Sequence, residues 1–264
     1  MSLRITIPMS FTSLTVVLTL LFISGCTINL DDDPPKEELL IYCGITMIQP
    51  MQEIADLFEA RTDCIVKFIK GGSGNLYRSI KANSAGDLYL PGSESYINTA
   101  KSEELVTQTL VVGFNRAAIL VKKGNPLAIQ PDLKSLVDSR YRVALGAEDS
   151  GSIGRETARI LRGSQLYDQA MKKALFLTTD SKDLTKAIME DRVDLVVNWY
   201  ATGLWPQHTP YVDVLRFNEE QVAPHRLVLG ILTFSINRGL SRDFMALAGS
   251  EEGQAIFRKC GFGQ

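Results

Sequence analysis

Histidine and cysteine are scarce in this sequence, and their scarcity limits the chemistry that the protein can carry out. The 264 residues include 2 histidines and 4 cysteines, and no Cys-x-x-Cys pair occurs. A zinc site usually needs four such ligands at close spacing, so we expect no metal and no cofactor. Beyond Cys26, only Cys43, Cys64 and Cys260 remain. They allow either one disulfide with one free thiol, or no disulfide.

The common catalytic and nucleotide-binding motifs are also missing. Residues 71–75 follow an apolar run, but the third glycine of a G-x-G-x-x-G loop would fall on Tyr77. Ser73 does not form a nucleophile elbow, because an asparagine stands where that motif needs its last glycine. A hydrolase would need His208 or His225 as its base, and both fall in segments that we expect to connect elements or lobes. We therefore predict that the protein is not an enzyme, and we keep a periplasmic hydrolase as the alternative.

Positive charge is not in excess, and long apolar runs are absent. The chain has 28 basic and 30 acidic side chains, a net charge of −2. This balance gives no reason to expect a nucleic acid as a partner. The apolar run at residues 14–23 is too short for a membrane-spanning helix, which needs about 20 residues. With Arg4 before it and no acid up to Gly25, the run predicts a signal peptide over residues 1–25.

A cysteine follows this predicted signal peptide directly. Residues 23–26, Ile-Ser-Gly-Cys, resemble the bacterial lipobox, in which the cysteine is lipidated and becomes the new amino terminus. The resemblance implies that Cys26 anchors the protein to a bacterial membrane, on the periplasmic side or at the cell surface. Residues 26–37 are acidic and contain proline, so we expect them to form a tether. Whether the inner or the outer membrane holds the lipid stays open.

From residue 38 onward, short apolar runs alternate with segments of helical period. This order predicts an α/β fold with mainly parallel sheets. Polar segments near residues 112–115 and 217–224 favour two lobes, with lobe I over 38–111 and 213–264 and lobe II over 112–212. The predicted strands are 39–43, 65–69, 87–90, 117–121, 143–145, 175–176, 194–197, 212–215 and 227–232, and helices are expected at 51–58, 133–137, 154–161, 182–189, from near 241, and 253–259.

Four of the predicted strand-to-helix junctions are rich in glycine and hydroxyl side chains. They are residues 44–46, 71–75, 150–154 and 178–181. In parallel sheets such junctions lie at the carboxyl edge of the strands, where open α/β folds bind ligands. The N–H groups at a helix start, supported by the helix dipole, can bind an anion. Ordinary N-capping explains any single junction, but four at the same edge favour an anion site.

Several segments taken in order resemble the periplasmic binding proteins for molybdate and related oxyanions, which feed ABC importers. The similarity is carried by residues 40–46 (LIYCGIT), 51–55 (MQEIA), 71–76 (GGSGNL), 86–89 (GDLY) and 252–262 (EGQAIFRKCGF). It covers nearly all of residues 38–264. The resemblance implies a type II binding-protein fold, in which two lobes close about a hinge over the solute. It also implies a monomer that delivers its solute to a permease, although similar proteins serve sensor kinases.

The resemblance also implies which residues hold the anion. Matching positions give Thr46, Ser73, the backbone of Ile153 and of Ser181, and Trp199. Trp199 stands where the family has a tyrosine, and it can donate only an N–H, so Asn198 and Tyr200 are alternative donors. Arg155 could pair with an anion through two hydrogen bonds. The expected ligand-binding residues are Thr46, Ser73, Gly74, Ser152, Ile153, Arg155, Ser181, Asn198, Trp199 and Tyr200.

The expected ligand is a small oxyanion. Molybdate, tungstate and sulfate carry no proton at neutral pH and suit a site made of donors alone. Phosphate carries a proton and would favour an acceptor such as Asp149 or Asp180. Arsenite would favour a thiol, for which Cys43 is the nearest candidate. We expect the molybdate and tungstate type first.

Overall fold

The computed structural model describes residues 36–218 and 222–263. The predicted signal peptide, Cys26 and all but the last two residues of the predicted tether lie outside this range. Within it, no helix is both long enough and apolar enough to cross a membrane.

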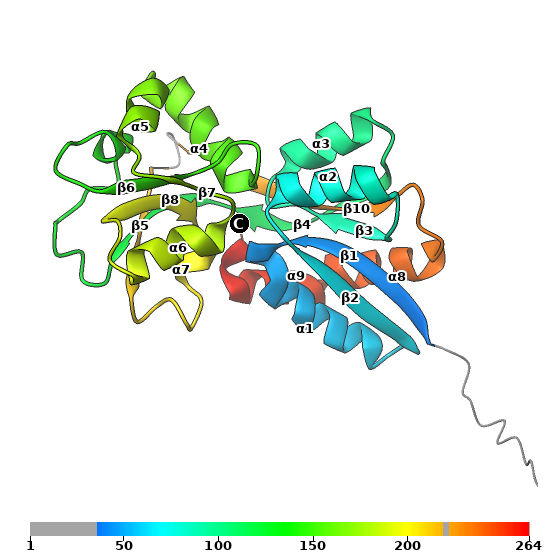
Figure 1. Ribbon diagram of the computed structural model, residues 1–264. Coiled ribbons are helices and arrows are strands. Elements are labelled where there is room, and N and C mark those ends of the chain that lie inside the picture. Colours follow the sequence, from blue (N-terminus) through cyan, green and yellow to red (C-terminus); the bar gives the residue numbers. More distant parts are fainter. Residues whose placement is uncertain (1–35, 219–221, 264) are drawn as a thin grey trace, which may run out of the picture. The chain divides into compact units, whose positions relative to one another are not determined.

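Two five-stranded sheets organise the fold (Figure 1). In each sheet four strands run in one direction and one strand, β10 or β5, runs against them. The predicted mainly parallel α/β architecture is therefore confirmed. The first sheet has the order β2 (Cys64–Gly71), β1 (Glu37–Gly44), β3 (Leu88–Leu90), β10 (His225–Leu232), β4 (Val106–Asn115). The second has the order β7 (Leu177–Thr178), β6 (Val143–Gly146), β8 (Leu195–Trp199), β5 (Ala117–Lys122), β9 (Val212–Arg216).

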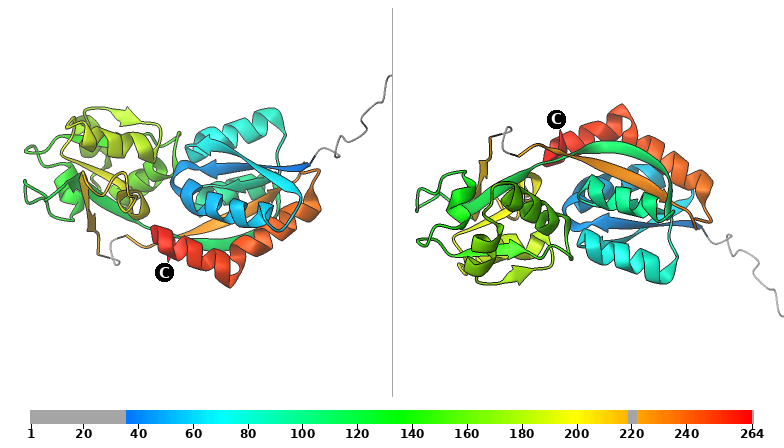
Figure 2. Two further views of the ribbon diagram at one scale, coloured as in Figure 1. Left: turned by 90° about the horizontal axis from the view of Figure 1, so that it is seen from below. Right: turned by 90° about the horizontal axis from the view of Figure 1, so that it is seen from above.

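Helices cover both faces of the first sheet. Side chains of β1 alternate between the faces: Leu39 and Ile41 pack in one apolar cluster, and Tyr42 packs in another. This alternation follows from the two-residue period of a strand. Figure 2 shows the carboxyl-terminal helices along this sheet. One face is covered by α1 (Ile48–Glu59), α8 (Arg238–Gly249) and α9 (Glu251–Phe257), and the other by α2 (Ser73–Asn83) and α3 (Glu94–Ser102).

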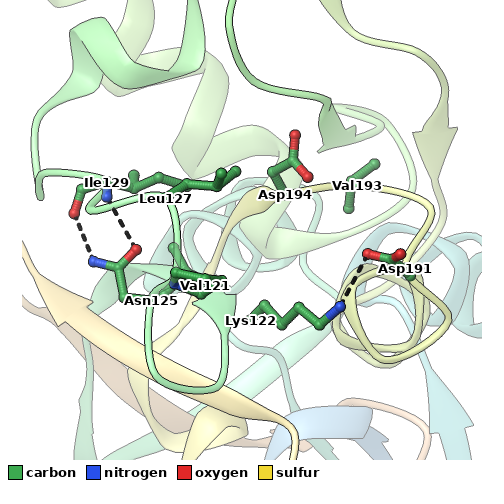
Figure 3. A pocket seen from close by; sticks show the side chains of 9 residues that line it. Val121, Lys122, Asn125, Leu127, Ile129, Asp191, Val193 and Asp194 are labelled. Atoms are coloured by element: carbon green, nitrogen blue, oxygen red, sulfur yellow. Dashed lines mark hydrogen bonds and ion pairs between the residues drawn. The ribbon is translucent and has the colours of Figure 1, made fainter.

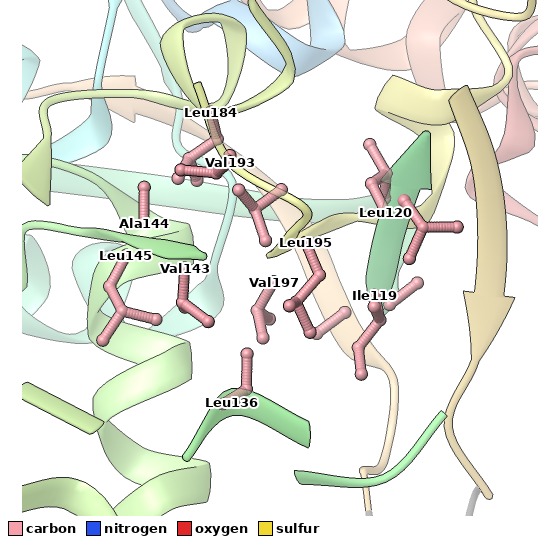
Figure 4. Packing of buried hydrophobic residues seen from close by; sticks show 14 of the residues in the cluster. Ile119, Leu120, Leu136, Val143, Ala144, Leu145, Leu184, Val193, Leu195 and Val197 are labelled. Atoms are coloured by element: carbon pink, nitrogen blue, oxygen red, sulfur yellow. The ribbon is translucent and has the colours of Figure 1, made fainter. Parts of the chain in front are cut away.

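The second sheet has a separate core, part of which Figure 4 shows. Ile119 and Leu120 of β5, and Leu195 of β8, are fully buried there. These strands are nearly continuous apolar runs, as expected for strands covered on both faces. The helices that accompany this sheet are α4 (Ser152–Gly163), α5 (Tyr167–Lys173), α6 (Ser181–Met189) and α7 (Tyr200–Gly203).

The chain passes between the sheets twice. β4 belongs to the first sheet up to Asn115, and β5 of the second sheet begins at Ala117, so the first passage is at Arg116. The second lies between β9, which ends at Arg216, and β10, which begins at His225. The predicted lobe boundaries lie at residues 112 and 213, and both changes of sheet fall a few residues after them.

Some local predictions are wrong. Residues 112–115 are not a polar connection but the end of β4, an edge strand whose side chains are largely exposed along its first half. The strand expected at 175–176 is a two-residue strand at Leu177–Thr178. The segment expected to be a helix at 133–137 is a 3₁₀ turn, Leu133–Leu136. The sequence pattern also did not predict α3 or α5.

Candidate functional site

Three helices begin around one pocket of about 220 Å³. Ser73, Ser152 and Ser181 are the first residues of α2, α4 and α6, and all three line the pocket. α2 packs against the first sheet, and α4 and α6 against the second. The first N–H groups of a helix have no acceptor within the helix. Those of Gly74 and Asn75 in α2 and of Lys182 and Asp183 in α6 bond to other protein oxygens. The three starts therefore bring to the pocket, from both sheets, their first residues and the positive ends of their dipoles.

The end of β1 and the turn after it complete the pocket. Thr46 lies in the 3₁₀ turn Ile45–Met47 (η1) and is buried. Its hydroxyl donates to Ser181 Oγ at 3.2 Å, which links the first sheet to the second. The pocket is lined by Gly44, Ile45, Thr46, Met47, Gly71, Gly72, Ser73, Gly92, Gly151, Ser152, Ile153, Asp180 and Ser181.

The serine hydroxyls at the pocket act as acceptors toward the protein. Ser73 Oγ accepts a hydrogen bond from the N–H of Gly92 at 3.0 Å. Ser152 Oγ accepts one from Trp199 Nε1 at 3.3 Å. A hydroxyl has one hydrogen to donate, so each of these serines can still donate that hydrogen to a ligand.

Charge at the pocket comes from backbone dipoles and not from cationic side chains. Among the described residues, the lining includes no lysine, arginine or histidine, and Asp180 is its single ionisable side chain. One oxygen of Asp180 caps α6 by accepting from the N–H groups of Lys182 (2.8 Å) and Asp183 (3.1 Å). The positive ends of three helices are therefore the main attraction for an anion.

Gly74 does not line the pocket. It lies where α2, which packs on the first sheet, contacts the loop before α4, which packs on the second. Its N–H donates to the carbonyl oxygen of Ser150 at 3.0 Å, and the N–H of Asn75 donates to the same oxygen at 3.3 Å. A Cβ on Gly74 would lie 2.3 Å from the Asp149 carbonyl oxygen. The absence of a side chain at Gly74 is what allows the start of α2 to approach the loop before α4.

Arg155 does not reach the pocket. Its guanidinium carbon lies 3.6 Å from the ring centroid of Tyr96, in a cation–π contact that joins α4 to α3. Burial raises the pKa of Tyr96, although the nearby Arg155 opposes this rise. The expected pairing of Arg155 with a bound anion therefore has no geometric support here.

The three candidates at the end of β8 lie behind or away from the pocket. The Asn198 amide donates to the Ser181 carbonyl oxygen at 2.8 Å and to Thr185 Oγ1 at 2.9 Å. Trp199 is fully buried and contacts the pocket through Ser152. Tyr200 lines a different groove, together with Arg216. Asn198 and Trp199 can thus support the pocket wall, and Tyr200 cannot touch a solute in the pocket.

The thiols do not contribute to the pocket. Cys43, Cys64 and Cys260 are all free and buried, so of the two disulfide states considered, the structure has no pair. The Cys43 thiol donates to the carbonyl oxygen of Gly44 at 3.5 Å. Burial holds the pKa of this thiol well above its ordinary value, which does not favour thiolate chemistry.

The two histidines also lie away from the pocket lining. His208 is buried, with Nδ1 2.7 Å from the Thr202 carbonyl oxygen, and burial lowers its pKa. His225 Nε2 lies 2.7 Å from Glu156 Oε2. Burial opposes ionisation of Glu156, but its contacts with Arg159 and His225 outweigh this effect and lower its pKa. Among the described residues, no group of three or more His, Cys, Asp or Glu side chains could hold a metal ion.

Gly92 is a pocket residue that the sequence analysis missed. It follows β3, and its N–H donates to Ser73 Oγ. A Cβ there would lie 2.3 Å from Ser152 Oγ, so any larger residue would displace the Ser152 hydroxyl from the pocket. Residues 91–93, Pro-Gly-Ser, stand just after a correctly predicted strand, and that position at the carboxyl edge is the signal that could have identified Gly92.

A larger hollow of about 480 Å³ lies at the far end of β5 (Figure 3). Its polar side chains already bond to protein groups: Lys122 to Asp191 at 3.4 Å, and Asn125 to the backbone of Ile129 at 3.0 Å. No helix start opens into it among the described residues. We therefore place the candidate site in the smaller pocket, where the starts of three helices converge.

Comparison with known proteins gives a family and a fold. The model of the family described as bacterial extracellular solute-binding protein matches residues 39–263. A Haemophilus influenzae protein provisionally named a binding protein is 23% identical over 160 residues, which are 61% of this chain and 65% of that relative's length. This chain thus covers a little less than two thirds of that relative.

Solved structures with the same fold include three binding proteins. The periplasmic molybdate-binding protein of Azotobacter vinelandii is 14% identical, with a TM-score of 0.70 over 86% of this chain and 99% of that one. The sulfate-binding protein of Mycobacterium tuberculosis is 13% identical, with a TM-score of 0.73 over 86% of each chain. A periplasmic thiamin-binding protein is 16% identical, with a TM-score of 0.74 over 86% of this chain and 82% of that one.

These structures confirm the expected two-lobed binding-protein fold. The family and its fold are those of binding proteins and not of enzymes, in keeping with a pocket of hydroxyls and helix starts that neither histidine lines. Because the family model spans nearly all of the described residues, the chain belongs to the bacterial extracellular solute-binding proteins.

Proposed function

We propose that this protein captures a small, fully deprotonated oxyanion of the molybdate or tungstate type for an ABC importer. The observation that carries the proposal is the convergence of three helix starts and the Thr46 hydroxyl on one buried pocket. Such a pocket replaces the hydration shell of an anion with fixed N–H and O–H donors. Solved relatives of the same fold are named for molybdate and sulfate.

The polarity of the pocket favours anions without a proton. The hydroxyls of Ser73, Ser152 and Ser181 accept from the protein, so each can donate its own hydrogen to a ligand. Asp180 is the one lining residue with a carboxylate among those described, and that carboxylate already accepts two backbone N–H groups. Sulfate fits the same donors, and hydrogen phosphate could use only Asp180 as its acceptor. Arsenite is disfavoured, because the Cys43 sulfur is not part of the lining.

Closure of two lobes is the proposed capture mechanism. We assign one lobe to each sheet and place the hinge where the chain passes between the sheets, at Arg116 and between β9 and β10. The hydrogen bond from Thr46 to Ser181, and those from Gly74 and Asn75 to Ser150, join the two sheets' elements. We infer that they form as the lobes close and break as they open.

The remaining parts of the proposal concern placement and partners. We propose that residues 1–25 are a cleaved signal peptide, that Cys26 carries the lipid, and that residues 27–37 tether a monomer to the membrane. The family's extracellular location supports export. The partner would be the importer's permease, and a membrane sensor kinase is the alternative receiver of the closed form.

A thermal-shift panel tests the proposal. The purified protein is melted with molybdate, tungstate, sulfate, phosphate, arsenate or arsenite, and with amino acids and sugars as controls. A ligand at 100 times its Kd should add about 2.7 kcal/mol, or roughly 5 to 10 °C in Tm. A shift with molybdate or tungstate that is smaller in Ser73→Ala would support the proposal. Shifts from sugars or amino acids alone would refute it.

A further inference from the structure

A second polar hollow, the hinge groove, lies where the chain passes between the sheets. Its volume is about 1000 Å³. It shares no lining residue with the pocket at the starts of α2, α4 and α6, which we call the oxyanion pocket. Four cations line it: Arg116, Arg216, Arg258 and Lys259. Among the described residues the lining contains no carboxylate, although the chain as a whole has a net charge of −2. The hinge groove is therefore a local positive region on an acidic protein.

The cations of the hinge groove come from elements of both sheets. Arg116 is the residue between β4 and β5, and Arg216 is the last residue of β9, opposite Ala118 of β5. Arg258 and Lys259 begin the turn Arg258–Phe262 (η3), which follows α9 beside the first sheet. A ligand that contacts all four would bridge the two sheets at their junction.

Part of the hinge groove is held in a fixed geometry. The guanidinium of Arg216 stacks on the Tyr200 ring at 4.3 Å and donates to the Tyr200 hydroxyl. The N–H of Tyr200 donates to the Arg116 carbonyl oxygen at 2.7 Å. On the opposite side, Gly261 has a φ of 90°, a conformation that suits glycine. A Cβ at Gly261 would lie 2.9 Å from Leu204 Cδ1 and 3.3 Å from the Cα of Ala201, so the glycine lets η3 pack closely against this part of the groove wall.

The remaining contacts leave cationic groups accessible. Lys259 Nζ lies 3.2 Å from Glu53, but its side chain is 72% exposed. An exposed pair of this kind contributes little to stability, so a stronger anion can compete for Lys259. Arg258 and Arg216 are also exposed.

We propose that the hinge groove binds a small molecule that carries at least two phosphate groups. Guanidinium groups bind phosphate oxygens in pairs, and lysine adds a point charge. The groove has a volume of about 1000 Å³ and four cations from three segments of the chain, so linked phosphates use more of its charge than one tetrahedral anion does. An acidic polypeptide would also need apolar contacts, and Leu204 is the one apolar side chain in the lining among the described residues.

Calorimetric titration of the purified protein with inorganic tripolyphosphate tests this proposal. Pyrophosphate and orthophosphate are titrated at the same ionic strength. We expect binding in the order tripolyphosphate, pyrophosphate, orthophosphate. Arg216→Gln and Arg258→Gln should each weaken tripolyphosphate binding by roughly tenfold, the loss expected for one charged hydrogen-bonding contact. Arg61→Gln is the matched control, since Arg61 is exposed and pairs with Glu252 away from the groove.

The outcomes separate this proposal from that of the oxyanion pocket. Tripolyphosphate binding should persist in Ser73→Ala, and any molybdate or tungstate binding should persist in Arg258→Gln. Loss of tripolyphosphate binding in Ser73→Ala would place that ligand in the oxyanion pocket and overturn the proposal. So would equal effects of Arg258→Gln and Arg61→Gln, or no heat from tripolyphosphate. Binding of an acidic peptide without binding of tripolyphosphate would replace the small molecule with a protein partner.

Discussion

The proposed oxyanion pocket and the proposed hinge groove would attract anions by opposite means. The pocket has about 220 Å³ and draws its positive potential from backbone N–H groups and hydroxyls of buried residues. The groove has about 1000 Å³ and draws it from four cationic side chains, three of them exposed. Buried dipoles are fixed by the fold and select by shape, whereas exposed charges adapt to a ligand and are screened by salt.

Two consecutive residues separate these regions. Trp199 reaches the pocket through Ser152, and Tyr200 faces the groove through Arg216. A single chain segment can therefore support a closed, neutral-donor site on one side and an open, charged site on the other. The comparison predicts that substitutions will affect one region and spare the other.

Blocking lobe closure should have the largest effect. A Cβ on Gly72 would lie 2.5 Å from the Ser150 carbonyl oxygen and 2.7 Å from that of Thr179. Because both neighbours are backbone atoms, we expect Gly72→Ala to abolish oxyanion binding at concentrations that saturate the wild type. Tripolyphosphate binding should remain, and calorimetry of both ligands checks this.

Gly163→Ala is the control for this change, since a Cβ at Gly163 meets nothing within 4 Å. If Gly72→Ala binds the oxyanion as tightly as the wild type and Gly163→Ala, the closed geometry is not needed for binding.

Removing a single hydroxyl should have an intermediate effect. Ser73→Ala and Thr46→Ala should each weaken oxyanion binding by about 1 to 3 kcal/mol. The first change removes a donor to the anion, and the second removes the hydrogen bond that holds the Ser181 hydroxyl at the pocket. Ser79→Ala lies on the same helix away from the pocket lining and should change nothing. Equal affinities for all three variants would mean that the site is misplaced.

Added salt should change the affinity of the pocket for its oxyanion less than either substitution does. It should weaken ligand binding at the groove more than at the pocket. Raising the salt concentration from about 0.1 M to 1 M shortens the screening length from about 10 Å to 3 Å. We expect tripolyphosphate affinity to fall by roughly tenfold, as one charged contact is lost. Oxyanion affinity should change much less, because its donors are buried. Parallel salt dependence of the two ligands would contradict the distinction between the regions.

The sequence predicted features that depend on local pattern. Strands β1, β5 and β10 were predicted because they are runs of apolar residues. The junctions after β1, β2 and β7 were recognised by their glycine and hydroxyl residues, and the resemblance to the family selected Thr46, Ser73 and Ser181 within them. β4 was missed because an exposed edge strand lacks the apolar alternation that marks a half-buried one. Its pairing with β10 is a contact between residues more than one hundred positions apart.

Features that depend on tertiary contacts could not be predicted. Arg155 stands in the first turn of α4, as expected, but the approach of α3 directs its guanidinium onto Tyr96. Trp199 was matched by position, yet its side chain lies behind Ser152. The groove unites Arg116, Arg216 and Arg258, which no local motif connects.

The position of β10 has a consequence for the order in which the protein can fold. β10 lies between β3 and β4 in the first sheet, but it follows every strand of the second sheet in the sequence. A chain that emerges amino end first can therefore complete the second sheet before the first. Until residues 225–232 arrive, β3 and β4 expose strand edges, which makes such intermediates prone to aggregation. The first sheet is thus the part most dependent on protection during synthesis and export.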